Sequence, residues 1–147
     1  MKATSLLSLL IACVTGCASG DHFSAMHPPP DKALVYIYRP NQIQWLAGVN
    51  ENATPHRIVF NGQFACELLN GGYCPYLATP GTNSIGCGPE FPASWPDSLG
   101  YTRKEILRTN FEAGATYYLR FSLGAWGPKM KFMEPSAAEA EIRKCKQ

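Results

Sequence analysis

The dipeptide Asn61-Gly62 sets the strongest constraint on the fold, because it lies between two apolar runs in the segment RIVFNGQFACELL. A type I′ turn needs positive φ at both of its central residues, and Asn-Gly adopts this conformation at low cost. Apolar residues on both sides then make the two runs adjacent strands of a hairpin. We therefore expect strands near residues 57–60 and 63–69.

Further short apolar runs, separated by turn residues, predict a mainly β domain. The segment ALVYIYR at residues 33–39 is rich in β-branched and aromatic side chains, which predicts a strand buried on both faces. Thirteen glycines and 12 prolines lie between such runs, which favours turns over long helices. We expect hairpins around residues 80–81 and 112–114, and the segment KMKFM completes the sheet.

The C-terminal segment PSAAEAEIRKCKQ changes to a helical period. Ser136 and Glu139 have the spacing of a capping box. Ala138, Ile142 and Cys145 fall on one helical stripe. We expect a short helix that packs its Cys145 side against the sheet. A chain of 147 residues is long enough for this single domain and hardly for two.

Residues 1–16 have the composition of a bacterial export signal. Lys2 gives a positive start, and an apolar stretch at residues 6–14 is followed by small residues. A membrane-spanning helix needs about 20 apolar residues, so this stretch is too short for one. The segment VTGC that ends at Cys17 resembles the lipobox of bacterial lipoproteins, in which the cysteine is lipidated and then begins the mature chain.

Two other interpretations of the leader stay open. The segment LIAC at Cys13 fits the same pattern, but it leaves too few residues for an apolar region and a cleavage region, which favours Cys17. Both cysteines could also be ordinary apolar residues in an uncleaved or simply secreted leader. Lipidation of Cys17 would anchor the chain firmly, because two or three acyl chains hold a protein where one does not. Ala18 after the cysteine, in place of Asp, favours the outer membrane facing the periplasm.

Residues 17–31 are interpreted as the lipidated end and a Pro-rich tether, and residues 32–147 as the β domain. The three consecutive prolines at 28–30 predict extended polyproline II structure. His22 and His27 lie in the tether, where a metal site would need further ligands. We interpret both histidines as part of a solvated segment.

Removal of the signal and lipidation of Cys17 leave four cysteines in the body: Cys66, Cys74, Cys87 and Cys145. An even number in an oxidising compartment predicts two disulfides, with three connectivities. If residues 80–81 are a complete two-residue hairpin loop, Cys74 faces Cys87 within disulfide reach, and Cys66 is left to Cys145. Pro-Gly suits such a hairpin poorly, so a register slip stays an alternative. The spacings contain no C-x₂-C pair, which argues against zinc.

Catalytic motifs are absent: there is no nucleophile elbow, no zinc-protease motif, no phosphate-binding loop and no C-x-x-C pair. His56 lies at the start of a predicted strand, and we expect its side chain to be on the surface. We therefore expect no enzyme, no cofactor and no metal, with an enzyme of unrecognised type as an alternative. Trp95, in the Pro-rich loop 89–102, is the candidate exposed contact, whereas Trp45 and Trp126 are interpreted as core residues.

The motifs ALVYIYRP, VFNG, LATPGT and AGATYYLR follow one another in this order behind the lipobox. In this order they resemble the bacterial lipoproteins that contain the domain of unknown function 2846, over roughly residues 32–143. The resemblance implies a small, antiparallel β-sandwich-like fold. It supplies no site, because the family has no assigned activity. The extra cysteines and the loop 89–102 depart from the family pattern.

The charge of the chain narrows the classes of partner. Thirteen Lys and Arg residues and 11 Asp and Glu residues are spread along the chain, with one small basic cluster of Arg143, Lys144 and Lys146. Such a balance argues against nucleic acid. We expect a lipid-anchored envelope protein that acts as a non-catalytic binding or scaffolding module for an envelope protein or peptidoglycan. The alternative is an inhibitor or immunity-type protein that inserts the loop 89–102 into a cell-wall hydrolase.

Overall fold

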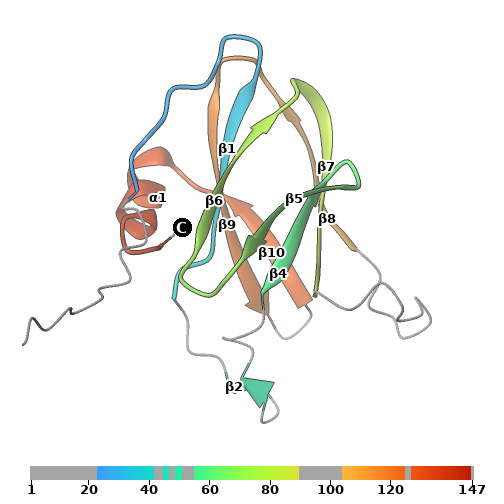
Figure 1. Ribbon diagram of the computed structural model, residues 1–147, viewed down its shortest axis with the longest axis vertical. Coiled ribbons are helices and arrows are strands. Elements are labelled where there is room, and N and C mark those ends of the chain that lie inside the picture. Colours follow the sequence, from blue (N-terminus) through green and yellow to red (C-terminus); the bar gives the residue numbers. More distant parts are fainter. Residues whose placement is uncertain are drawn as a thin grey trace, which may run out of the picture.

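The computed structural model describes residues 23–41, 45–46, 49–50, 55–89, 104–124 and 127–146. In this part of the chain two four-stranded sheets face each other, and one short helix lies outside the first sheet (Figure 1). Sheet 1 has the strand order β10-β9-β1-β6, and sheet 2 has the order β5-β4-β7-β8. The predicted mainly β, sandwich-like fold with a short C-terminal helix is confirmed.

Sheet 1 consists of β1 (Ala33–Tyr38), β6 (Tyr73–Ala78), β9 (Thr116–Gly124) and β10 (Gly127–Phe132). Sheet 2 consists of β4 (His56–Phe60), β5 (Gln63–Leu68), β7 (Gly81–Pro89) and β8 (Lys104–Phe111). A small ribbon pairs β2 (Trp45–Leu46) with β3 (Val49–Asn50), and the helix α1 spans Pro135–Ile142. The pairs within both sheets are antiparallel except for β1 with β9, which is parallel.

The strand β1 is buried on both faces, as its composition predicts. Ala33, Val35 and Ile37 point into the core between the sheets. Leu34, Tyr36 and Tyr38 point to the opposite side, where α1 covers them. Both hydrogen-bonding edges of β1 are also occupied, by β6 and by β9. The strand is therefore the centre of a three-layer arrangement of helix, sheet 1 and sheet 2.

The layer outside sheet 1 includes chain that the sequence assigns to the tether. Phe23 is buried, and its ring packs edge-on against Tyr36 and Tyr73. The backbone N–H of Met26 donates to the hydroxyl of Tyr36 at 2.8 Å. Packed residues thus include Phe23, which lies ahead of the predicted domain boundary at residue 32.

The Asn61-Gly62 hairpin forms as predicted and joins β4 to β5. Asn61 has φ 50° and Gly62 has φ 81°, the positive values that a type I′ turn requires. The side chain of Asn61 also accepts a hydrogen bond from the backbone N–H of Ser84 at 2.9 Å. The turn is therefore attached to β7, the other neighbour of β4.

Two other predicted hairpins are wrong, because their strands belong to different sheets. The turn at Pro80-Gly81 carries the chain from β6 in sheet 1 to β7 in sheet 2. The turn at residues 112–114 carries it back from β8 in sheet 2 to β9 in sheet 1. The segment KMKFM does complete sheet 1, as β10 beside β9. Local turn residues indicate that the chain reverses, but the identity of the strand's partner depends on contacts far away in sequence.

The crossing at Pro80-Gly81 is held by Asn83, a buried polar residue with 2% of its surface exposed. Its amide nitrogen donates to the carbonyl oxygens of Thr79 at 2.8 Å and Gly81 at 2.9 Å. Its amide oxygen accepts from the side chain of Asn61 at 3.0 Å. One side chain thus links the sheet-crossing turn to the hairpin turn beside it.

The helix α1 begins after Glu134, and no side chain caps its first turn. The predicted capping box of Ser136 and Glu139 is therefore wrong; Glu139 instead accepts a hydrogen bond from the hydroxyl of Tyr118. The predicted apolar stripe is confirmed, since Ala138 and Ile142 are fully buried and Cys145 is 5% exposed. Packing of this stripe, rather than capping, holds the helix.

We predict that Asn83→Ala lowers the free energy of unfolding by about 1–3 kcal/mol, because it removes hydrogen bonds from buried backbone and amide groups. The measurement is the urea midpoint of unfolding. Asn110→Ala is the matched control, because Asn110 is exposed on β8. Equal midpoints for the two variants would contradict the role given to Asn83.

Candidate functional site

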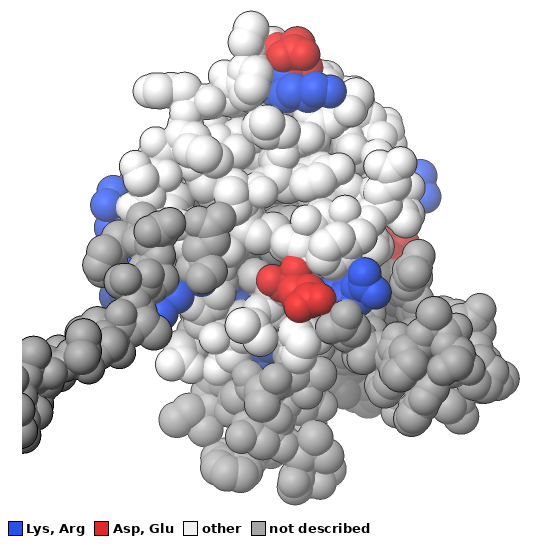
Figure 2. Space-filling model, in the orientation of Figure 1, with Lys and Arg blue, Asp and Glu red and all other residues white. Residues whose placement is uncertain are grey.

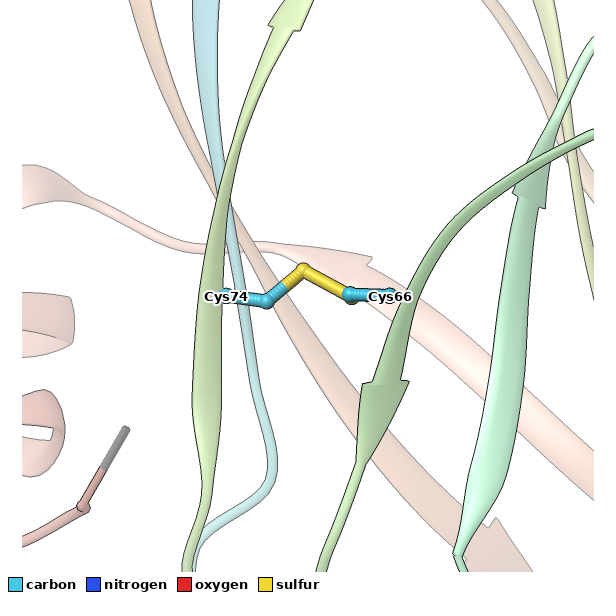
Figure 3. Close-up of a disulfide and its surroundings, with 2 residues drawn as sticks. All are labelled: Cys66 and Cys74. Carbon is cyan, nitrogen blue, oxygen red and sulfur yellow. A yellow bond between two sulfur atoms is a disulfide. The ribbon is translucent and has the colours of Figure 1, made fainter.

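A disulfide between Cys66 and Cys74 joins the two sheets at their edges (Figure 3). Cys66 lies on β5, the edge strand of sheet 2, and Cys74 lies on β6, the edge strand of sheet 1. The turn between these strands brings the two edges together, so that the Cα atoms are 6.6 Å apart. The bridge therefore closes one side of the sandwich with a covalent bond.

The predicted pairs Cys74–Cys87 and Cys66–Cys145 are both wrong. Cys87 lies on β7, inside sheet 2, so it does not face Cys74 across a hairpin. Cys145 packs on the outer side of sheet 1, whereas Cys66 packs against the core between the sheets. Sheet 1 therefore separates the second pair, and Cys87 and Cys145 are buried free thiols.

His56 is buried, with 9% of its surface exposed, although the sequence places it on the surface. It begins β4, and its ring lies against the ring of Phe121 on β9 at 5.1 Å. Its Nδ1 lies 3.7 Å from the Sγ of Cys87 on β7, which is paired with Ile58, two residues along β4 from His56. The sandwich thus brings together a histidine and a cysteine that are 31 residues apart.

The His56–Cys87 pair is uncharged at neutral pH. Burial, together with the positive charge of Arg39, lowers the pKa of His56 from 6.5 to about 4. Burial raises the pKa of the Cys87 thiol to about 12, an effect that Arg39 only partly opposes. A thiol attacks an electrophile as the thiolate, and a catalytic dyad holds the thiolate beside a protonated imidazole. This pair instead favours the neutral thiol and the neutral imidazole.

The pair also lacks the further ligands of a metal site. A structural zinc ion takes four ligands, and the described residues contain no group of three or more His, Cys, Asp or Glu side chains that could hold a metal. The Nε2 of His56 has no hydrogen-bond partner within the described ranges. The arrangement gives a packed, polar contact in the core, and its chemistry is that of a weak S–H donor beside a neutral imidazole.

The remaining predicted site residues lie elsewhere. Cys17, His22, Trp95 and Trp126 are outside the described residues, as are residues 90–102 of the predicted loop. Trp45 forms β2, and only its backbone is described. His27 is exposed in the segment after Phe23. None of these positions is brought to the His56–Cys87 pair by a described contact.

A second polar cluster lies between sheet 1 and α1. The hydroxyl of Tyr38 donates to Glu141 at 2.9 Å, and the hydroxyl of Tyr118 donates to Glu139 at 2.9 Å. Burial and then the adjacent carboxylate raise the pKa of each tyrosine. Glu141 also forms an ion pair with Arg120 at 3.0 Å. These contacts hold the helix over β1 and β9. The acidic side chains of the helix therefore have a structural role.

The sequence reading missed the role of Phe23 and the burial of Arg39, which is 2% exposed. Phe23 is a single aromatic residue in an otherwise small and polar segment, and this isolated ring was the signal that the segment packs. Arg39 ends an apolar run and gives no comparable signal. Its place beside His56 and Cys87 follows from the assembly of three strands.

Among the described residues, no helix is long and apolar enough to pass through a bilayer. In comparisons with known proteins, the chain matches no family model and no curated protein. The resemblance to lipoproteins with the domain of unknown function 2846 therefore stays a prediction.

We predict that the double variant Cys66→Ala/Cys74→Ala unfolds with a free energy about 2–3 kcal/mol lower than the parent, because the bridge closes a loop of 8 residues in the unfolded chain. Urea unfolding with and without reductant measures this difference. Reductant should destabilise the parent to a similar extent and leave the variant unchanged. Alkylation of the unreduced, unfolded parent at Cys66 or Cys74 would contradict the pairing.

We predict that His56 makes the fold less stable as the pH falls from 6.5 to 4. Over this range the unfolded chain binds a proton that the folded chain excludes, so the free energy of unfolding decreases; above pH 6.5 the contribution is constant. His56→Gln should make the decrease shallower in urea titrations at successive pH values. The exposed His27→Gln is the control, and an unchanged slope for His56→Gln would overturn the prediction.

Proposed function

We propose that this chain is a lipid-anchored bacterial envelope protein whose β-sandwich is a non-catalytic binding or scaffolding module. Residues 1–16 are the signal peptide, and the lipid is attached at Cys17. The domain then faces the periplasm from the outer membrane, and its partner is an envelope protein or peptidoglycan.

The observation that carries the proposal is the disulfide between Cys66 and Cys74. Structural disulfides persist in exported proteins and are rare in the reducing cytosol. Here the bridge holds the edges of two sheets together in a domain that follows an export signal and a lipobox. The bridge and the leader thus point to the same compartment, although they lie in different parts of the chain.

The absence of catalytic activity is supported by the state of the His56–Cys87 pair. Burial favours the neutral form of both groups, so the pair is not an activated nucleophile. The face shown in Figure 2 carries few charged side chains among its described residues. Such a surface suits a protein or glycan partner better than a nucleic acid.

An exposed aromatic residue on the outer side of sheet 2 is the contact we assign to the partner. Ile58 and Phe60 belong to the core, so Arg57 and Val59, which alternate with them, face outward. Phe64 is paired with Val59 and is 52% exposed. The guanidinium of Arg57 lies 4.7 Å from the centre of the Phe64 ring. An aromatic ring with a stacked arginine is a frequent anchor in binding surfaces.

We predict that mass spectrometry of the natively processed protein finds a chain that begins at Cys17 and carries a diacylglyceryl thioether. Cys17→Ser should remove the modification and release the protein from the membrane fraction, because the acyl chains supply the binding free energy. Cys13→Ser is the control and should leave the anchor intact. An unmodified thiol at Cys17, or a retained Met1, would overturn the anchor.

The binding role is tested in intact cells with a photo-crosslinking residue in place of Phe64. A discrete adduct with an envelope protein or peptidoglycan is expected, whereas the same residue in place of the exposed Lys129 on β10 should give none. If both positions give the same mixture of adducts, with no discrete product from position 64, the assigned surface is contradicted. An adduct with a cell-wall hydrolase whose activity the protein lowers would favour an inhibitor.

A further inference from the structure

The C-terminal residues hold positive charge beside the point where the described chain begins. The guanidinium of Arg143 lies 5.7 Å from the centre of the Phe23 ring. The backbone N–H of Lys146 donates to the carbonyl of Gly71 at 2.8 Å, and its carbonyl accepts from Tyr73 at 3.2 Å. The C-terminus is therefore fixed to the sandwich. We call Arg143, Lys144 and Lys146 the basic end.

The acidic residues near the basic end are already engaged. Glu139 lies 3.5 Å from Arg143, and Glu141 lies 3.0 Å from Arg120. Lys144 and Lys146 are exposed and form no ion pair within the described ranges. In Figure 2, blue side chains are visible at the edge of the molecule where α1 lies. The basic end thus presents net positive charge to the solvent.

Two exposed apolar residues belong to segments that contact the basic end. Leu69 is 54% exposed, in the turn that leads to Gly71 and therefore to the backbone of Lys146. Met26 is 48% exposed, three residues after Phe23. Basic side chains attract anionic headgroups, and adjacent apolar side chains can enter the boundary of the acyl chains. A lipid surface offers partners for both kinds of side chain.

The proposed anchor lies within a short reach of the same place. Six residue steps separate Cys17 from Phe23, and an extended chain covers at most about 3.6 Å per residue. Phe23 is therefore within roughly 20 Å of the lipidated residue, and Arg143 is packed on Phe23. In Figure 1, α1 also lies beside the start of the coloured chain.

We infer that the basic end is a second membrane contact, which docks on anionic phospholipid and orients the domain. This inference rests on the proposed lipid anchor. The anchor keeps the domain near the bilayer, and the basic end determines which face of the domain meets the lipid. The helix side of sheet 1 then faces the bilayer, and the outer side of sheet 2, with Phe64, faces away from it. The anchor alone attaches one point of the chain to the bilayer and does not determine which face of the domain meets the lipid.

The surface is tested first without the anchor. The mature chain with Cys17→Ser is sedimented with vesicles of equal parts phosphatidylcholine and phosphatidylglycerol, and with vesicles of phosphatidylcholine alone. Binding to the anionic vesicles is expected, with loss in high salt. Lys144→Gln/Lys146→Gln should weaken it at least about tenfold, since each lysine near an anionic surface contributes about a factor of five. Arg108→Gln is the control, because Arg108 is exposed on the outer side of sheet 2, and it should bind like the parent.

The second test uses the natively lipidated protein in the same two kinds of vesicle. A water-soluble acylating reagent modifies exposed lysines, and mass spectrometry compares their rates. Lys144 and Lys146 should be modified severalfold more slowly on anionic vesicles than on phosphatidylcholine vesicles, and high salt should remove the difference. The docking surface is contradicted if Lys144 and Lys146 are acylated at equal rates in both kinds of vesicle and the unlipidated protein does not bind anionic vesicles. This result would not affect the proposed lipid anchor. Anionic binding by a native protein that carries no lipid would overturn the anchor alone.

Discussion

A strand that is apolar on both faces needs a cover on each side, and β1 imposes this requirement on the whole chain. Sheet 2 covers one face and forms the main core. The other face is covered by α1 and by Phe23, which come from opposite ends of the sequence. The two ends of the domain are thus brought together because both pack on the same strand. The place of the basic end beside the start of the described chain follows from this packing.

Much of the local structure could be predicted from the residues alone. Asn61-Gly62 determines its turn by backbone conformation, and the composition of β1 indicates burial on both faces. The crossings at residues 80–81 and 112–114 could not be predicted, because a turn residue does not reveal whether the next strand joins the same sheet. The disulfide pairing depends on those crossings. Because the predicted hairpin at residues 80–81 was wrong, both predicted disulfides were wrong as well.

The candidate site also depends on contacts between residues that are far apart in the sequence. His56 is buried because β7 and β9 supply Cys87 and Phe121 around it, and neither strand is near it in the sequence. The absence of a catalytic motif is a property of the sequence, whereas the neutral state of the pair is a property of the assembled core. Both support the proposal of a non-catalytic binding module. The two observations are independent, because the missing motif depends on residue types and the neutral state of the pair depends on desolvation.

The parallel pairing of β1 with β9 also has a mechanical consequence. A force on the proposed lipid anchor would enter the domain through Phe23 and would then act along the axis of β1. Because β6 and β9 flank that strand, its two ladders of hydrogen bonds are loaded in shear and must yield together. The packed segment before β1 would peel away first and lengthen the connection. The proposed anchor would thus be joined to the sandwich through a segment that can detach while the hydrogen bonds of β1 still hold.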